Sequence, residues 1–244
     1  MPTPQPLLIE MEDASYAPGE VAVLDGISFS ADERRIGIVG RNGSGKTSLA
    51  RVLAGLVPPT AGRVRIAGVD VGRDRKTALR TVGILFQNPD HQIIFPTVEE
   101  EIGFGLSQLG FSKPEVTAGV GAILAKFDKS HWTNAPIHQL SQGQRQLVCL
   151  MSVLAMSPRL IVLDEPFSGL DIPTTLQLAR VLDAIDAHLL HITHDSSHLL
   201  AYDRVLWIEA GRITQDGPAK PVIAAFQARM AELGGGDDLT HLAG

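Results

Sequence analysis

The sequence has a single cysteine, no apolar run long enough to cross a bilayer and no excess of positive charge. Cys149 cannot form an internal disulfide, and its apolar helical surroundings favour a buried thiol over a reactive one. A transmembrane helix needs about 20 apolar residues in succession, which no segment provides. The formal net charge of −6 weighs slightly against a nucleic-acid-binding surface. We therefore expect no nucleic-acid partner.

The first residues, Met1 to Pro6, lack the charged region and the apolar region of a secretory signal. We therefore expect a cytosolic chain that serves a membrane only through partners. The 244 residues, 44% of them hydrophobic, allow one large domain or one domain with an inserted lobe.

One stretch has the pattern of a phosphate-binding loop, with an apolar strand before it and a helix after it. Its glycines let backbone N–H groups point inward, and the helix N-terminus adds partial positive charge. Lys46 can reach the β- and γ-phosphates, and the Thr47 hydroxyl can bind Mg²⁺. We expect the nucleotide to contact Gly40, Asn42, Gly43, Ser44, Gly45, Lys46, Thr47 and Ser48.

The pattern of elements changes in the middle of the chain. Three capping patterns, at Thr97, Ser112 and Ser141, predict three helix starts in a region without a convincing strand. Apolar strands flank this region on both sides, so we expect a helical lobe inserted into an α/β core. The expected division is one domain over 1–244, with core segments 7–94 and 158–233, a helical lobe 95–157 and a flexible tail 234–244.

Two adjacent acids, Asp164 and Glu165, end an apolar strand. Strand ends in a parallel sheet open onto the ligand crevice. We expect Asp164 to hold Mg²⁺ or its water beside Thr47, and Glu165 to orient or deprotonate an attacking water. Taken singly, either acid could be a helix cap or a loop residue.

A second phosphate site is predicted at Leu140 to Gln144, where a glycine at a helix start exposes free N–H groups. Ser141, Gly143 and Gln144 are its candidate residues. The two sites lie on different lobes, which a head-to-tail dimer would reconcile by sandwiching each ATP between two chains. Alone, this stretch would be read as a plain helix cap.

Together these motifs resemble ABC-type ATPases over roughly residues 7–233. The resemblance implies an α/β P-loop NTPase: a RecA-like core, an antiparallel β subdomain and an inserted α-helical subdomain. It also implies that Tyr16 stacks on adenine, that Gln87 links the Mg²⁺ site to the helical lobe, that Asp171 communicates across the dimer and that His194 contacts the γ-phosphate. Gln142 stands where the commonest signature has glycine, and we expect little loss from it. Asp32-Glu33 replaces a Pro-Gly turn, with an expected effect on local turn geometry only.

The run from Phe86 to Gly105 resembles the ATPases of energy-coupling factor (ECF) transporters, and in detail those of biotin-specific systems. Cobalt, nickel and other vitamin systems have similar ATPases and remain open. The resemblance implies that ATP is the substrate, that Mg²⁺ is the cofactor and that a second ATPase subunit is a partner. It also implies a peripheral position at the cytoplasmic face of the inner membrane. A transmembrane scaffold with arginine-bearing helices would dock directly and a substrate-binding membrane subunit would act indirectly. Candidate acids for the scaffold are Asp90, Glu99, Glu100 and Glu101, although glutamates also favour a helix start through its dipole.

Two other classes of P-loop protein must be weighed against a transporter ATPase. Soluble ABC machines that act on ribosomes or DNA usually carry two ATPase modules, a long coiled-coil insertion or a basic surface, none of which this sequence has. A nucleotide kinase would lack the stretch at Ser141 to Gln144 and would need an arginine-rich lid. We therefore expect a transporter ATPase.

Overall fold

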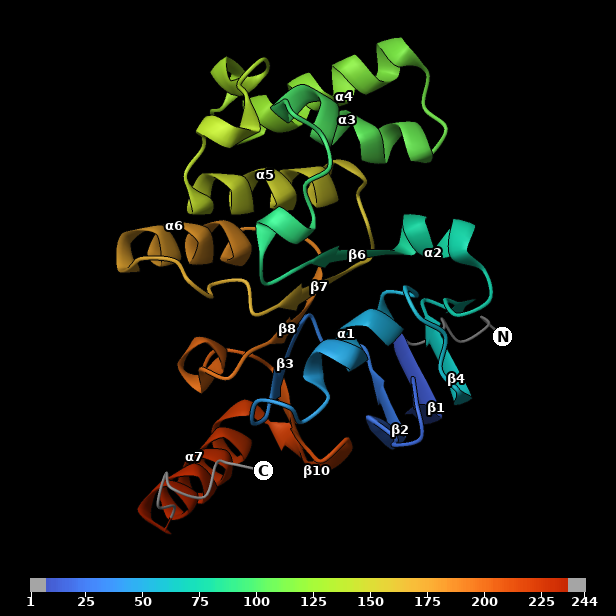
Figure 1. The fold of residues 1–244 in the computed structure, drawn as a ribbon, viewed down its shortest axis with the longest axis vertical. Helices are drawn as coiled ribbons and strands as arrows, with labels where there is room; N and C mark the ends of the chain where they lie inside the picture. The colour runs from blue at the N-terminus through green and yellow to red at the C-terminus, as the bar shows by residue number, and fades with distance from the viewer. Residues whose placement is uncertain (1–7, 237–244) are drawn as a thin grey trace, which may run out of the picture.

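The computed structural model describes residues 8–236 and contains two sheets (Figure 1). The proline-rich lead and the end of the predicted tail lie outside the described residues. An antiparallel sheet has the order β2-β1-β4-β5, with β1 Ile9–Tyr16, β2 Leu24–Ala31, β4 Ala61–Ile66 and β5 Val69–Asp70. A larger sheet has the order β10-β9-β3-β8-β7-β6, with β3 Arg35–Val39, β6 Val82–Leu85, β7 Leu160–Asp164, β8 His188–Ile192, β9 Arg204–Glu209 and β10 Arg212–Pro218.

Helices lie above, between and below the strands in the view of Figure 1, with α1 near the centre. The α-helices are α1 Lys46–Leu53, α2 Arg75–Thr81, α3 Val98–Gln108, α4 Lys113–Lys126, α5 Gln142–Ala155, α6 Ile172–Asp183 and α7 Ala219–Gly236. Short 3₁₀ turns are η1 Pro89–His91, η2 Ser130–Trp132, η3 Ile137–Gln139 and η4 Ser196–Leu199. In the view of Figure 1, α3, α4 and α5 lie at the top and α7 lies at the bottom.

The α1 helix packs in the core between the two sheets. Its side chains Leu49 and Leu53 are fully buried in one apolar cluster with residues of β1, β2 and β4 and of the larger sheet. Strand β7 is buried at every position, as expected for a parallel strand covered on both faces. The position of α1 therefore fixes the loop before it against the larger sheet.

Helices α3, α4 and α5 share an apolar cluster of their own, which includes Ile102, Leu124 and Met151. The predicted capping box at the start of α5 is confirmed: Gln144 N–H donates to Ser141 Oγ over 3.3 Å, and Ser141 N–H donates to Gln144 Oε1 over 2.8 Å. Over residues 8–236, no helix is both long and apolar enough to span a bilayer.

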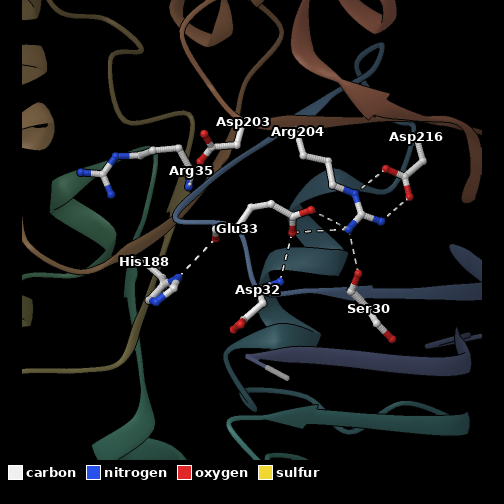
Figure 2. Close-up of polar contacts among 8 residues, drawn as sticks. All are labelled: Ser30, Asp32, Glu33, Arg35, His188, Asp203, Arg204 and Asp216. Atoms are coloured by element: carbon white, nitrogen blue, oxygen red, sulfur yellow. Dashed lines mark hydrogen bonds and ion pairs between the residues drawn. The ribbon is translucent and has the colours of Figure 1, made fainter. Parts of the chain in front are cut away.

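A polar network joins the two sheets (Figure 2). The Arg204 guanidinium binds Asp216 through two hydrogen bonds, of 2.7 and 2.6 Å. Its Nη1 also donates to the Ser30 carbonyl at 2.7 Å and to Glu33 Oε1 at 3.2 Å. Glu33 thus connects the end of β2 to β9, so the expectation that Asp32-Glu33 affects only local turn geometry is wrong.

Two element ends differ from the sequence prediction. The helix expected to reach about His188 ends at Asp183, because Arg35 donates to the carbonyls of Ile185 and Ala187 and holds the following turn. Residues 234–236, expected to belong to a flexible tail, are instead the last residues of α7. Neither end is marked by a strong local signal in the sequence.

Candidate functional site

Three neighbouring parallel strands bring the predicted site residues to one edge of the larger sheet. Strand β3 pairs with β8, and β8 pairs with β7, all in parallel. Their carboxyl ends therefore lie at the same edge. The phosphate-binding loop follows β3, His194 follows β8, and Asp164 ends β7.

The loop after β3 needs glycine at two positions for steric reasons. Gly45 has φ +101°, and a Cβ there would lie 2.7 Å from the Val23 carbonyl oxygen. A Cβ on Gly40 would come within 2.3 Å of a backbone oxygen. The Lys46 ammonium donates to the carbonyls of Gly40 and Arg41 at 2.8 and 2.9 Å, which holds it inside the loop.

Burial shapes the charges of the site. It lowers the pKa of Lys46, against the opposing effect of Glu165, Asp164 and Glu209. It raises the pKa of Asp164, against a hydrogen bond of 3.4 Å from the Thr47 hydroxyl. The Lys46 ammonium and the Asp164 carboxylate are therefore both desolvated and face the same space. A polyphosphate bound there would pair with the ammonium, and a metal cation would pair with the carboxylate.

Glu165 has an unusual backbone and contacts His194. Its φ of +51° lies in the left-handed region, a conformation that costs a non-glycine residue roughly 1 kcal/mol. Its N–H donates to the Ile192 carbonyl over 2.9 Å, which extends the sheet ladder by one residue. Its Oε2 lies 2.8 Å from His194 Nδ1, with side-chain exposures of 11% for the acid and 60% for the histidine. The pair therefore stands at the mouth of the site.

A cavity of about 290 Å³ opens at this edge. It is lined by Val23, Asn42, Gly43, Gly45, Lys46, Thr47, Ser48, Gln87, Glu165 and His194. Most of the predicted residues are thus together. Tyr16 is outside the lining, but its carbonyl accepts a 2.8 Å hydrogen bond from Val23 N–H, so it stands next to the cavity wall.

Ser141, Gly143 and Gln144 line a different cavity of about 390 Å³, which also has α6 residues in its wall. One chain does not bring the two predicted phosphate sites together. Gly143 also has a packing reason to be glycine, since a Cβ there would lie 2.2 Å from Thr174 Cγ2. Asp171 accepts a 2.9 Å hydrogen bond from Thr174 N–H at the start of α6, and the hydrogen bonds from Thr174 lower its pKa.

Contacts of Ser168 connect the site to the helical region and were not predicted. Gln87 Nε2 donates to Ser168 Oγ over 3.0 Å. Gln142 Nε2 donates to the Ser168 carbonyl over a long 3.5 Å, and a Cβ on Gly169 would lie 2.9 Å from the same nitrogen. The unusual Gln142 was the one sequence signal of this contact, because glycine at that position has no side chain to reach Ser168.

A family model described as ABC transporter matches residues 24–168, and the chain belongs to this family. The class of protein defined by this family and site is an ATP-binding and ATP-hydrolysing subunit. Among curated relatives, the biotin transport ATP-binding protein BioM of Rhodobacter capsulatus is 51% identical over 86% of this chain and 90% of its own length. The energy-coupling factor transporter ATP-binding protein EcfA of Methanocaldococcus jannaschii is 36% identical over 93% of this chain and 85% of its own.

The fold also matches a solved structure. CbiO1 from Clostridium perfringens, part of the ABC transporter complex cbiONQ, superposes with a TM-score of 0.78 and 27% identity. The match covers 93% of this chain and 95% of that one. The predicted fold class, an ABC-type P-loop ATPase, is confirmed.

Proposed function

We propose that this ATPase energises an ECF-type importer and that the imported solute is biotin. The observation that carries the proposal is the 51% identity to a biotin transport ATPase across 86% of the chain. An ECF ATPase for cobalt, nickel or a vitamin other than biotin is the alternative; the similarity to EcfA supports the ECF class and names no solute. In this proposal the solute binds a separate membrane subunit, so selectivity does not depend on the ATPase.

In the proposed site, the phosphate-binding loop and Lys46 hold the β- and γ-phosphates of ATP. Ser44 Oγ supports this role, because it is buried in the loop without a hydrogen-bond partner among residues 8–236 and can donate to a phosphate oxygen. The oxygen donors Thr47, Gln87 and Asp164 suit Mg²⁺, which neutralises phosphate charge when bound. Tyr16 would stack on the adenine.

Glu165 is proposed to orient or deprotonate the attacking water, and His194 to contact the γ-phosphate. The 2.8 Å contact supports a shared role, because it engages His194 Nδ1 with Glu165 Oε2 and leaves Nε2 for the nucleotide. Both side chains line the same cavity as Lys46.

A second copy of the chain is proposed to complete each site. Ser141, Gly143 and Gln144 lie in a separate cavity of the same chain, so a head-to-tail dimer is needed to place them on ATP. The N-terminus of α5 would then face the γ-phosphate bound to the partner subunit. Asp171 would communicate between the subunits from the start of α6.

A groove of about 420 Å³ between the core and the helical region is proposed to receive the transmembrane scaffold. Its wall is mainly apolar and includes Leu79, Phe104 and Met156. Of the four acids predicted to contact the scaffold, Glu99 and Glu100 are proposed to meet its arginines, although neither lines the groove and Glu100 Oε2 accepts a 2.5 Å hydrogen bond from the Thr97 hydroxyl. The other two acids are engaged: Asp90 lies 2.9 Å from Arg145 Nε, and Glu101 is 6% exposed and hydrogen-bonded to the backbone.

The subunit would bind the cytoplasmic face of the inner membrane through that scaffold, and the substrate-binding membrane subunit would be engaged indirectly. The test is to produce the ATPase together with its scaffold and substrate-binding subunits and to measure ATP-dependent uptake of biotin, Co²⁺ and Ni²⁺ into vesicles. Biotin uptake that disappears with Lys46→Ala supports the proposal. Metal uptake without biotin uptake favours the alternative, and a subunit that binds no membrane partner contradicts both.

A further inference from the structure

Four aromatic side chains form a cluster beside the site, which we call the His191 cluster: Phe167, His191, His198 and Tyr202. His191 belongs to β8, and its ring centroid lies 5.4 Å from that of Phe167 at 74° and 6.4 Å from that of His198 at 26°. Phe167 and His198 are in direct contact, with centroids 4.5 Å apart. The nucleotide-site residues described above do not include any of these side chains.

His191 is the buried centre of the cluster. It is 1% exposed, and its Nδ1 lies 3.0 Å from the Tyr202 hydroxyl. Burial raises the pKa of Tyr202 and lowers the pKa of His191 to about 3, so both groups are neutral at physiological pH. The neutral hydroxyl and Nδ1 share one hydrogen bond, whose direction depends on the imidazole tautomer. Nε2 has no hydrogen-bond partner among the described residues, so that side of the ring depends on packing.

The cluster joins the two loops that carry the proposed chemistry. Phe167 follows Glu165 by two residues, and His198 follows His194 by four. The segment η4, which carries His198, also inserts Leu199 against β3: a Cβ on Gly37 would lie 2.7 Å from Leu199 Cδ1. The loop after β8 is thus held at the β3 sheet surface, and the Phe167–His198 contact ties it to the loop after β7.

We propose that Phe167 and His198 are positioning residues, which pack against His191 and against each other and hold His194 against Glu165 for ATP hydrolysis. The proposal rests on the roles proposed above for Glu165 and His194. The two loops come from different strands, and the described hydrogen bond between their side chains is the part-buried His194–Glu165 contact at the mouth of the site. Loss of this half-buried aromatic contact would let His194 move relative to Glu165 while the phosphate-binding loop keeps its shape.

The test uses the full-length subunit and compares His198→Ala with His198→Phe. The phenylalanine keeps an aromatic ring on Phe167 but removes the 3.6 Å contact between His198 and Asp195. Because misplacing a catalytic group by about 1 Å can cost about 100-fold in rate, we expect His198→Ala to lower kcat roughly 10- to 100-fold. The Kd for ATP should change little, and His198→Phe should restore most of kcat. Phe167→Leu should behave like His198→Ala, and the exposed His131→Ala is the matched control.

Thermal unfolding of each variant separates positioning from loss of structure. A folded His198→Ala subunit that hydrolyses ATP at the wild-type rate overturns the proposal. Equal loss of turnover in His198→Phe and His198→Ala also overturns it, because the contact with Asp195 would then matter rather than stacking. Failure of the underlying function is distinguishable: Glu165→Gln and His194→Ala would then retain normal turnover themselves.

Discussion

The Glu101 carboxylate accepts a hydrogen bond of 2.9 Å from the backbone N–H of Ile94. The same oxygen accepts a second one of 2.9 Å from the N–H of Phe95. This acid, which starts α3 beside two other glutamates, therefore fixes the segment that leads into the helical region. Its neighbour Glu99 makes no such contact among the described hydrogen bonds, so acids of the same helix turn have different structural roles.

We expect Glu101→Ala to destabilise the isolated subunit while Glu99→Ala does not. Removing the carboxylate leaves two part-buried N–H donors without this partner, which costs about 1 kcal/mol or more in the free energy of unfolding. Urea unfolding of the two variants and of the wild type measures the difference. Equal stability of all three would mean that water replaces the carboxylate without loss.

The glutamates of α3 show which contacts can be predicted from the sequence and which cannot. The convergence of Lys46, Glu165 and His194 was predictable, because each follows an apolar strand and the carboxyl ends of parallel strands share an edge. The inward direction of Glu101 was not predictable, because the run of three glutamates suits a helix N-terminus at every position. The contact between Phe167 and His198 depends on β7 and β8 being neighbours, which no local pattern specifies. The domain division and the roles of the site residues stay predictions.

Glu165→Gln should bind ATP but hydrolyse it at a rate lower by about 100-fold or more, since general-base catalysis contributes typically 10²–10⁴-fold. Glutamine keeps the size of the side chain and an acceptor toward His194, so binding should be retained and an ATP-bound dimer should accumulate. Lys46→Ala is the contrasting variant, which should lose nucleotide binding. Size-exclusion chromatography with ATP and a phosphate-release assay measure both effects. Normal turnover in Glu165→Gln would contradict the assignment.

Charge reversal of Glu99 or Glu100 to lysine should weaken assembly with the scaffold. If either acid pairs with a scaffold arginine, breaking the pair costs roughly 2–5 kcal/mol in binding. ATPase activity of the isolated subunit should change little, because neither acid lines the nucleotide cavity. Pull-down of the scaffold by each variant is the measurement, with Glu115→Lys on α4 as the control. Unchanged assembly in both variants would leave docking to apolar groove residues such as Phe104.

Gln142 and Gly169 should be energetically coupled. A methyl group on Gly169 would lie 2.9 Å from Gln142 Nε2 and would also strain a backbone with φ +73°. In a Gln142→Ala background the side-chain clash is gone and only the backbone strain remains. Gly169→Ala should therefore destabilise the wild type more than the Gln142→Ala variant, by about 0.5 kcal/mol or more. Urea unfolding of the four proteins measures this coupling. If the changes in the free energy of unfolding are strictly additive, the Gln142 side chain does not contact position 169 in solution.

His191 should make the subunit less stable in mild acid. Burial lowers its pKa from 6.5 to about 3, with a smaller effect of the nearby His198. Between these values the unfolded chain binds a proton that the folded chain does not, so the free energy of unfolding falls as the pH decreases below 6.5. Between about pH 7.5 and about pH 5.5 this one group should remove about 1.4 kcal/mol. His191→Asn keeps an acceptor for the Tyr202 hydroxyl and cannot titrate, so its loss over the same range should be smaller by that amount. Urea unfolding of both proteins at the two pH values measures the difference, with His131→Asn as the exposed control. An equal acid loss in wild type and His191→Asn would show that His191 gains its proton without unfolding.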